Sequence, residues 1–373
     1  MDLKKAKNKI AALLERVDVR VNGDRPWDIQ VIDERLYARV LAQGSIGIGE
    51  AYMDGWWNVK KLDAFFSRVI RGNLPEQLTW NLPTLLLTLQ ARFLNMQTEF
   101  RSTKVAKKHY DLGNDFYMSF LDPYNQYTCG YFKGTHDLNE AQENKLDLIC
   151  RKLQLSSKDH VLDIGCGWGG FARFASDKYG CHVTGVSISS EQIKYAREFT
   201  KGLPVEIINS DYRKLAGTFD KVLICGMIEH VGYKNYGTIM KKVSECLKKG
   251  GLYLVHTIGS NRSNRSTDPW MSKYIFPNSM TPSMAQLTRA AEPYFVLEDW
   301  QNIGLHYVKT LKAWFDNFEA NWDQFKDSYG DRFYRMWKYY LLGSAGFFAS
   351  RKGQLWQLVF SKDGLIDGYQ VER

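Results

Sequence analysis

Residues 160–170 read His-Val-Leu-Asp-Ile-Gly-Cys-Gly-Trp-Gly-Gly, an apolar run followed by a cluster of glycines. The apolar part, residues 160–164, predicts a buried β-strand that ends at Gly165. Phe171, Phe174 and Ala175 follow at the spacing of one helix face. Glycines between a strand and a helix let the backbone approach a ligand at the helix N-terminus. The segment therefore predicts a strand–turn–helix unit with a ligand site in its turn.

The alternation of strand and helix continues on both sides of this unit. A helical face precedes it, and strand-like runs follow at residues 182–187, 205–208, 221–225 and 252–256, with helical stretches between them. Such alternation predicts right-handed βαβ units and an α/β fold with a doubly wound parallel sheet. Two later runs, residues 295–298 and 355–360, are expected to complete this sheet. The stretch between them is helix-rich and includes Trp314, Phe315, Phe318 and Trp322.

Residues 1–97 predict a smaller, mostly helical N-terminal domain. Leu62, Phe65, Phe66 and Val69 recur at i, i+3, i+4 and i+7, the spacing of a helix face. A glycine-dense stretch, residues 44–49, precedes Trp56 and Trp57, and we expect Gly49 to cap the segment that carries them. Residues 98–108 are polar and basic and predict a linker. Residues 109–373 then form the catalytic domain.

Composition limits the protein classes. The 373 residues are 44% hydrophobic and 24% charged, which excludes a disordered chain. The longest apolar stretch, residues 82–89, contains Pro83 and is too short to span a membrane. Lysines near Met1 lead into an amphipathic segment and not into a secretory signal, so we expect a cytoplasmic protein.

Cysteine count and charge narrow the site classes further. The six cysteines form no C-x-x-C pair, so neither a zinc cluster nor a disulfide framework is expected, and no metal site is predicted. The net charge of +9 fits nucleic acid, an anionic membrane or solubility alone. Aromatic residues, at 14%, suit nucleic-acid binding, an apolar ligand or a stabilised cation. Composition does not choose among these.

Two features decide which cofactor suits the glycine turn. Gly165, Gly167 and Gly170 also satisfy the dinucleotide pattern G-x-G-x-x-G. However, the carboxylate of Asp163 would repel a pyrophosphate and attract a cationic group. Residues 186–190, Val-Ser-Ile-Ser-Ser, also lack the acid that usually holds an adenosine ribose. S-adenosylmethionine has a sulfonium, an ammonium and no phosphates, so it fits better than NAD.

The turn also resembles a known signature. Residues 161–170 look like the motif of S-adenosylmethionine-dependent methyltransferases, and Gly-Cys-Gly-Trp-Gly is similar to that of the cyclopropane-fatty-acid-phospholipid synthase and mycolic acid cyclopropane synthase family. The other segments that resemble this family are residues 47–57, 109–115, 126–131, 226–232, 256–259, 273–277 and 355–357. The likeness covers nearly the whole chain and implies a Rossmann-like methyltransferase sheet. It includes the N-terminal domain that the bacterial phospholipid-modifying members have and the mycolate members lack.

The resemblance implies a set of cofactor contacts. In addition to the carboxylate of Asp163, the residues expected near S-adenosylmethionine are Tyr127, Thr128, Gly165, Gly167, Gly169, Ser187, Gln192, Asp211 and Tyr212. The glycines would meet its methionine part, Ser187 to Gln192 the ribose, and Asp211 with Tyr212 the adenine.

Methylation of an alkene requires a stabilised cation and a base. Attack of a π bond on the sulfonium methyl leaves a carbocation-like centre, which aromatic faces stabilise; the aromatic candidates are Tyr131, Trp270, Tyr274, Phe276 and Tyr307. No single side chain stands out as the base, and the resemblance implies a bound bicarbonate ion instead. Its expected cage is Cys129, Glu229, His256, the backbone N–H of Ile258 and the hydroxyl of Tyr307. Glu229 and His256 are expected just after the ends of parallel strands, where ligands of such sheets bind.

One position departs from the family pattern. Some relatives carry a cysteine, proposed as catalytic, where this chain has Ser344. A cysteine there is therefore not required if this chain is active, which favours the bicarbonate base.

The predicted function is methylene transfer to the cis double bond of acyl chains in membrane phospholipids. The resemblance implies a homodimer, and we expect peripheral association with the inner face of the cell membrane and no nucleic-acid partner. The expected membrane contacts are Lys4, Lys5, Lys7, Lys9, Lys104, Lys107, Lys108, Trp56, Trp57, Trp80 and residues 85–87. Two alternatives remain: a methyltransferase that leaves a methyl or methylene branch, and an inactive lipid- or nucleic-acid-binding relative.

Overall fold

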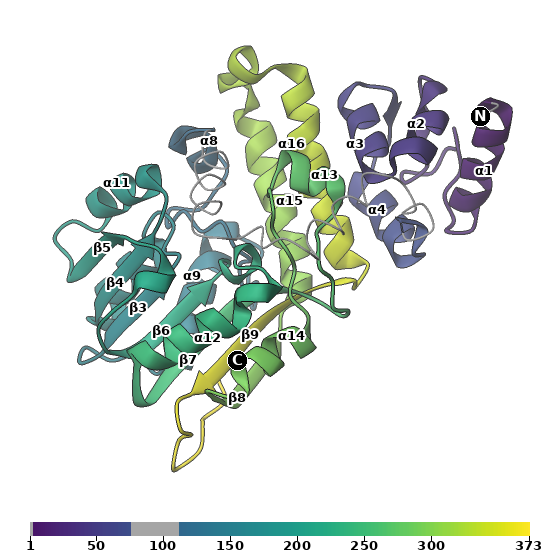
Figure 1. Ribbon diagram of the computed structural model, residues 1–373. Coiled ribbons are helices and arrows are strands. Elements are labelled where there is room, and N and C mark those ends of the chain that lie inside the picture. The colour runs from purple at the N-terminus through teal and green to yellow at the C-terminus, as the bar shows by residue number, and fades with distance from the viewer. Residues whose placement is uncertain (1–2, 76–111) are drawn as a thin grey trace. The chain divides into compact units, whose positions relative to one another are not determined.

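The computed structural model describes residues 3–75 and 112–373, which separate into two compact units (Figure 1). The first unit combines the N-terminal helices with Arg265–Pro277 and Tyr307–Gly353. The second contains the other described residues from 112 onward. Two segments of the range predicted as the catalytic domain thus belong to the unit of the N-terminal helices. The predicted linker, residues 98–108, lies outside the described residues.

A seven-stranded sheet forms the centre of the second unit, in the order β5-β4-β3-β6-β7-β9-β8. Its strands are β3 (His160–Ile164), β4 (His182–Ser187), β5 (Val205–Asn209), β6 (Phe219–Cys225), β7 (Leu247–Ser260), β8 (Val296–Asn302) and β9 (Gly353–Ser361). The strands from β3 to β7 pair in parallel, and β8 pairs with β9 antiparallel. The predicted doubly wound sheet is confirmed, and the two late strands complete it.

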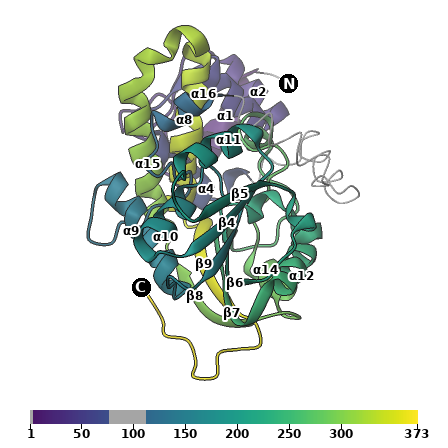
Figure 2. The ribbon, with the colours of Figure 1, turned by 90° about the vertical axis from the view of Figure 1, so that its left-hand side faces the viewer.

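Helices cover both faces of this sheet. Figure 2 shows α9 (Leu138–Lys152) and α10 (Gly170–Tyr179) on one face, with α12 (Tyr236–Cys246) and α14 (Met284–Ala291) on the other. Because side chains alternate along a strand, Val161 packs in the core under α9 and α10, whereas Leu162 packs under α12 and α14. The shorter elements of this unit are α8 (Asn114–Met118), α11 (Ser190–Phe199) and three 3₁₀ turns, η1 (Tyr212–Lys214), η2 (Ile228–His230) and η3 (Tyr233–Asn235).

The strand order places a ligand position at the middle of the sheet. β3 leads through α10 to β4 on one side, while β6 lies on the other side of β3. The chain therefore diverges at the carboxyl ends of β3 and β6, which is where open α/β sheets bind ligands. The glycine turn follows β3 at this point, and η2 with Glu229 follows β6.

Helices make up nearly all of the first unit. Its elements are α1 (Leu3–Glu15), β1 (Gln30–Val31), α2 (Arg35–Gln43), α3 (Ser45–Met53), β2 (Trp57–Asn58), α4 (Leu62–Arg71), α13 (Pro269–Tyr274), most of α15 (Gly304–Asn321), η4 (Trp322–Gln324) and α16 (Lys326–Ala349). As predicted, Leu62, Phe65 and Val69 form the buried face of α4. This helix packs closely on α16, because a Cβ on Gly346 would lie 2.6 Å from the carbonyl oxygen of Asp63.

The prediction that Gly49 caps a segment is wrong. Gly49 lies inside α3, and a Cβ there would come within 2.3 Å of the Trp270 ring. The cap of α2 is Gly44 instead, with φ +58° and its N–H donating to the carbonyl of Val40. The glycines of this stretch therefore serve one helix end and close helix packing.

Candidate active site

The glycine turn after β3 leaves space above its backbone. Gly165, Gly167 and Gly169 have φ values of +86°, +54° and +83°, a region that favours glycine. A Cβ on Gly167 would meet nothing within 4 Å, whereas one on Gly170 would lie 1.9 Å from the carbonyl oxygen of Tyr124. The turn is thus closed at Gly170 and open at Gly167, as a ligand that approaches the backbone requires.

Asp163 supplies a carboxyl group at the end of β3. Burial raises the pKa of Asp163 to about 7, although the positive charge of Lys145 opposes the shift. An ammonium group bound beside this carboxyl would favour its ionised form. The position therefore suits the amino-acid part of S-adenosylmethionine.

The predicted ribose and adenine contacts surround the ends of β4 and β5. Ser187 and Gln192 are buried, with Ser187 Oγ 3.4 Å from Gln192 Oε1. Asp211 accepts bonds from the Arg213 N–H at 2.9 Å and from Arg213 Nη1 at 2.8 Å. Burial raises the pKa of Tyr212 to about 12, and its hydroxyl has no partner within the described part of the chain. Asp211 is thus engaged with its neighbour, and Tyr212 keeps hydrogen-bonding capacity for a ligand.

Tyr127 lies in an aromatic cluster beside the glycine turn. Its ring is 5.3 Å from that of Tyr117, which is also 5.3 Å from the Trp168 ring of the turn. Trp168 Nε1 donates to Asn114 Oδ1 at 2.8 Å. The structure thus links Tyr127 through Tyr117 to Trp168 of the turn; its contact with the cofactor stays a prediction.

Two residues of α9 hold the segment that carries Tyr127 and Thr128. Gln142 Nε2 donates to the carbonyl of Thr128 at 2.8 Å, and Lys145 Nζ donates to Thr128 Oγ1 at 3.0 Å and also to Gln126 Oε1. Both side chains are fully buried. Burial lowers the pKa of Lys145, and the nearby Asp122 and Asp163 oppose this shift. Helix α9 therefore fixes the predicted cofactor segment against the turn.

Sequence reasoning missed Gln142 and Lys145, although a signal was present. Gln142, Lys145, Ile149 and Lys152 are spaced three and four apart on α9, so they share one helix face with buried apolar residues. A lysine within an apolar stripe is unusual because its charge is costly to bury. That irregularity in the helical pattern was the available signal.

Glu229 lies in η2, just after β6, and His256 lies in the neighbouring strand β7, opposite Cys225 at the end of β6. Glu229 Oε1 accepts the N–H of Ile258 at 2.7 Å, while Glu229 Oε2 is buried without a partner in the described residues. Burial raises the pKa of Glu229 to about 7, and the Ile258 N–H opposes the shift. The Ile258 N–H, predicted to hold an anion, is thus occupied by Glu229. The prediction that His256 follows the end of its strand is wrong. β7 continues to Ser260, so His256 lies within it.

His256 is fully buried, and its two ring nitrogens differ. Nδ1 lies 3.2 Å from Gln357 Nε2, while Nε2 has no partner among residues 3–75 and 112–373. Burial lowers the pKa of His256 well below its usual value, and the charges of Lys145 and Lys152 lower it further. The imidazole is therefore neutral, in a region of positive potential.

The remaining predicted residues divide between the two units. Cys129 is buried in the second unit, with its Sγ 3.2 Å from the carbonyl oxygen of Gly130. Tyr307 belongs to the first unit, where its ring is 4.6 Å from that of Phe348. Trp270 and Tyr274 are also in the first unit, and the Tyr274 hydroxyl donates to Glu50 Oε1 at 2.8 Å. These two aromatics therefore contribute to packing and polar contacts within that unit.

Comparison with known proteins identifies the family. Residues 97–358 match the model of the mycolic acid cyclopropane synthetase family. The chain is also 48% identical over 361 residues to the cyclopropane-fatty-acyl-phospholipid synthase of Escherichia coli K12, covering 97% of this chain and 94% of that protein. The chain belongs to this family. It is an S-adenosylmethionine-dependent methyltransferase, as the glycine turn and the sequence resemblance predict.

Other relatives extend the comparison. Sphingolipid C9-methyltransferase A of Emericella nidulans is 31% identical over 327 residues, covering 83% of this chain and 60% of that protein. The cyclopropane synthase MmaA2 from Mycobacterium tuberculosis superposes with a TM-score of 0.66 at 25% identity, covering 72% of this chain and all of that one. The mycolic acid cyclopropane synthase CmaA1, solved with SAH and CTAB, gives 0.65 at 27% identity, covering 70% of this chain and 98% of that one. These solved structures share the Rossmann-like sheet.

Proposed function

We propose that the protein transfers a methylene group from S-adenosylmethionine to the cis double bond of unsaturated acyl chains in membrane phospholipids, forming a cyclopropane ring. Bound bicarbonate serves as the general base. The similarity to the Escherichia coli synthase, which spans nearly the full length of both chains, supports the reaction and the phospholipid substrate.

The observation that carries the base assignment is a pair of buried polar atoms. Glu229 Oε2, just after β6, and His256 Nε2, within the neighbouring β7, have no partner in the described structure. Such atoms are costly unless a ligand satisfies them. The positive charges of Lys145 and Lys152 favour an anion beside His256. A small oxyanion that can both donate and accept hydrogen bonds, such as bicarbonate, fits these groups.

The residues of the chain have distinct roles in this reaction. The glycine turn and Asp163 position the methionine part of the cofactor, so that its sulfonium methyl faces the alkene. Aromatic side chains such as Tyr131 stabilise the carbocation-like centre that forms after attack. Bicarbonate accepts the proton lost from the transferred methyl when the ring closes, and S-adenosylhomocysteine leaves. His256 donates from Nε2, and Glu229 accepts the O–H of bicarbonate at Oε2, to keep the base in place.

A second candidate reaction ends in a branch instead of a ring. The match to the sphingolipid C9-methyltransferase, at 31% identity, supports transfer of a methyl group without ring closure. For a methyl branch, the cation loses a proton from a carbon of the acyl chain and leaves a branched alkene, so no base at the new methyl is needed. An exocyclic methylene would still need a base there. The buried pair Glu229 and His256 favours the ring.

We propose further that the protein docks on the inner face of the cell membrane and acts as a homodimer. In the described structure α1 buries Ala6 and Ile10, while Lys4, Lys5 and Lys9 are exposed. Lys7 pairs with Glu34 at 2.5 Å. Exposed lysines attract anionic headgroups by about 1 kcal/mol each. No helix in the described residues is long and apolar enough to cross a membrane.

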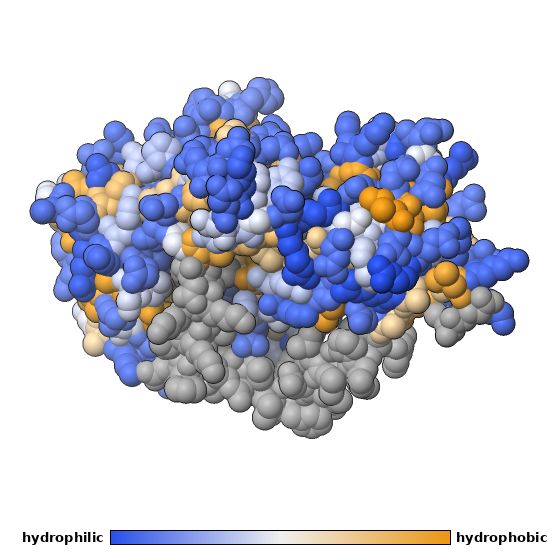
Figure 3. Space-filling model, turned by 90° about the horizontal axis from the view of Figure 1, so that it is seen from above, coloured by the Kyte–Doolittle hydropathy of each residue, from blue (hydrophilic) through white to orange (hydrophobic). Residues whose placement is uncertain are grey.

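The aromatic part of the predicted membrane contact needs correction. Trp57 is fully buried and donates to the carbonyl of Ile48 at 3.0 Å, so it is a core residue. Trp56 lies beside the guanidinium groups of Arg35 and Arg39, at 4.6 and 4.8 Å. Hydrophilic residues cover most of the surface visible in Figure 3. Ile32, 65% exposed, bonds through its N–H to the carbonyl of Trp56 and is the better apolar contact. Trp80, residues 85–87 and the three lysines after residue 100 lie outside the described residues.

Incubation with unsaturated phospholipid vesicles and S-adenosylmethionine tests the reaction. We expect each modified acyl chain to gain one CH₂, with cyclopropane protons in the NMR spectrum; signals of a methyl branch or an exocyclic methylene would support the second candidate. Removal of carbonate should slow the enzyme and added bicarbonate should restore it, while borate should compete. Full activity after rigorous degassing and carbonate-free purification would contradict the bicarbonate base.

Vesicle co-sedimentation tests membrane docking. Binding of the full-length protein to anionic vesicles should fall as salt rises, since salt screens charges beyond about 10 Å at 0.1 M. Ile32→Asp should weaken the binding of the protein to anionic vesicles. Sedimentation equilibrium tests the dimer.

A further inference from the structure

Gln357 occupies an unusual position in the middle of the sheet. It lies in β9, next to β7, and its side chain is fully buried. Its Nε2 atom is 3.2 Å from Nδ1 of His256, and its Oε1 atom has no partner within the described ranges. The residues on either side, Trp356 and Leu358, pack in the apolar core. Within the described residues, the Gln357 amide therefore has one hydrogen-bond partner, which is the histidine of the proposed anion site.

Because His256 is neutral, the donor and the acceptor of this hydrogen bond can be assigned. Neutral imidazole has one N–H donor and one acceptor nitrogen, and the hydrogen bond at one nitrogen sets the role of the other. The Gln357 amide donates to Nδ1, so the proton of the imidazole resides on Nε2. That nitrogen is the one without a partner among the described residues. The N–H at Nε2 is thus free to donate to an anion.

We propose that Gln357 is a positioning residue that fixes the tautomer of His256 and so makes Nε2 a donor. The inference rests on the proposed bicarbonate site and names the residue that prepares it. With the opposite tautomer, the Nε2 lone pair would repel the anion, and the donor would be lost. A residue that orients a histidine in this way typically changes affinity or activity by about 10- to 100-fold when replaced.

A purely structural role would not explain an amide at this point. Burying an amide whose oxygen has no partner is destabilising. An apolar side chain of similar size would avoid that cost in a strand that is buried along its whole length. The contact with His256 is the feature of the described structure that offsets it.

Two variants and a matched control test the proposal in the full-length protein. Gln357→Glu places a carboxylate that accepts from Nδ1, so it favours the opposite tautomer. Gln357→Met removes the amide while keeping a similar volume. Gln354→Glu is the control, because Gln354 is a buried glutamine of the same strand whose Oε1 accepts from Asn302 Nδ2 at 2.8 Å.

The first readout is the tautomer of His256, measured by two-bond ¹H–¹⁵N correlation with ¹⁵N-labelled histidine and assigned with His256→Gln. The second is the bicarbonate concentration that gives half-maximal activity in carbonate-depleted buffer. We expect the Nε2–H form in the wild type and in the control, and the Nδ1–H form in Gln357→Glu. Half-maximal activation should need about 10- to 100-fold more bicarbonate in both Gln357 variants, with an unchanged KM for S-adenosylmethionine.

The outcomes separate the two hypotheses. If Gln357→Glu does not fold, Gln357→Met decides: a wild-type tautomer and bicarbonate response in this variant would overturn the role of Gln357. The same result in a folded Gln357→Glu would also overturn it. A wild-type enzyme that is indifferent to bicarbonate, with the Nε2–H tautomer present, would overturn the anion site while leaving the tautomer assignment intact.

Discussion

Two glycine-dense stretches of this chain look alike in sequence and differ in physical purpose. In the turn after β3, Gly167 has a positive φ and open space around the position of a Cβ. In α3, a Cβ on Gly47 would lie 2.4 Å from the carbonyl of Arg39, and one on Gly49 would meet Trp270. The first stretch keeps room for a ligand, whereas the second lets helices approach one another. Glycine density alone therefore does not identify a site.

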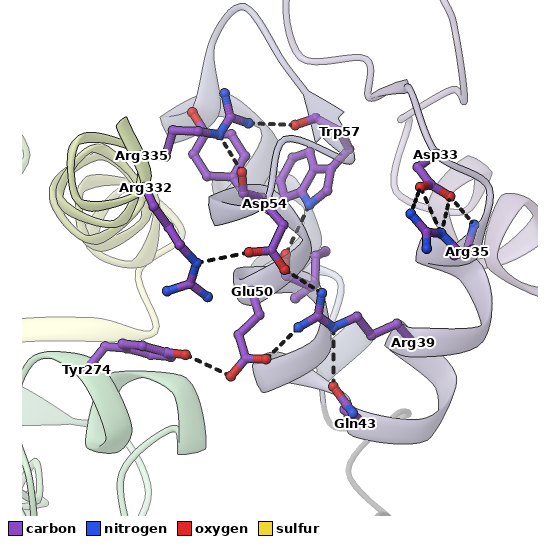
Figure 4. A network of polar contacts seen from close by, with 12 residues as sticks. Asp33, Arg35, Arg39, Gln43, Glu50, Asp54, Trp57, Tyr274, Arg332 and Arg335 are labelled. Carbon is purple, nitrogen blue, oxygen red and sulfur yellow. Dashed lines mark hydrogen bonds and ion pairs between the residues drawn. The ribbon is translucent and has the colours of Figure 1, made fainter. Parts of the chain in front are cut away.

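Two carboxyl groups, Glu50 in the first unit and Glu229 in the second, show a similar contrast. Glu50 follows Gly49 and accepts bonds from Arg39 at 2.5 Å and from Tyr274 at 2.8 Å (Figure 4). Lys273 Nζ lies 2.6 Å from the same carboxylate. Glu229 Oε1 accepts the N–H of Ile258, and Glu229 Oε2 stays without a partner in the structure described. Neighbouring side chains thus satisfy the carboxylate of Glu50, whereas Glu229 retains one oxygen without a partner in the described residues.

The largest expected effect separates the two carboxyls by activity. Glu229→Gln should lower turnover by about 10²–10³, because a preorganised contact to the base is lost. The affinity for S-adenosylmethionine, measured by calorimetry, should stay nearly unchanged. Glu50→Gln should leave the affinity for S-adenosylmethionine unchanged as well, and lower stability instead. Parallel loss of cofactor binding in Glu229→Gln would contradict its assignment to the base.

The next effect concerns Lys145, which holds the segment that carries Tyr127 and Thr128. Lys145→Met removes the bonds to Gln126 and Thr128 and the positive charge near Asp163. The pKa of Asp163 should then rise above about 7, so that its protonated form attracts the cofactor less. We expect the KM for S-adenosylmethionine to rise by about tenfold at neutral pH, a loss of about 1.4 kcal/mol, and to recover partly at higher pH. The exposed Lys241→Met is the control. A KM that does not depend on pH in Lys145→Met would contradict the proposed effect of the Lys145 charge on the pKa of Asp163.

A pair of alanine substitutions tests the comparison of the glycines directly. Gly167→Ala should weaken S-adenosylmethionine binding several-fold and lower stability by about 1 kcal/mol, since its φ is positive and the open space at this position is where we propose that the cofactor binds. Gly49→Ala should lower stability by about 1–3 kcal/mol through overpacking against Trp270, with little change in cofactor affinity. Thermal unfolding and cofactor titration of both variants provide the measurement. Equal effects on affinity would remove the distinction between the two stretches.

The smallest expected effect is on how stability depends on pH, and it should have opposite signs for Glu229 and Glu50. Burial raises the pKa of Glu229 from 4.5 to about 7. Its folded form thus keeps a proton that the unfolded chain releases, and the stability that follows is lost as pH rises through 7. Burial opposes ionisation of Glu50, but bonds from Lys273, Tyr274 and Arg39 outweigh it, and the pKa of Glu50 lies below 4.5. The stability from Glu50 is therefore present above 4.5 and lost in acid.

Urea unfolding of both glutamine variants across this pH range checks the prediction. Glu229→Gln should reduce the loss of stability between about pH 5 and 8, while Glu50→Gln should reduce the loss on the acid side. The same change in slope for both variants would contradict the contrast between the two carboxyls.

Much of the sheet was predictable because its signals are local. The predicted runs 160–164 and 182–187 match β3 and β4 residue for residue, since an apolar strand bounded by glycine or a polar turn has few other conformations. Glu229 was expected just after a parallel strand, and it lies in η2 after β6. Lys145 and Gln357 were missed, because a lysine in a helix and a glutamine in a strand usually face solvent. Only neighbours from distant parts of the chain reveal their burial.

The sequence by itself determined the order of strands and helices, the glycine turn and the family, since all three follow from local periodicity and short motifs. Tertiary structure alone decided that Trp57 is a core residue, that Gly49 packs against Trp270, and that the Ile258 N–H binds Glu229. It also decided which buried polar atoms stay without a protein partner in the described residues. The physical reason is that space and hydrogen-bond satisfaction depend on residues far apart in sequence, which no local pattern contains.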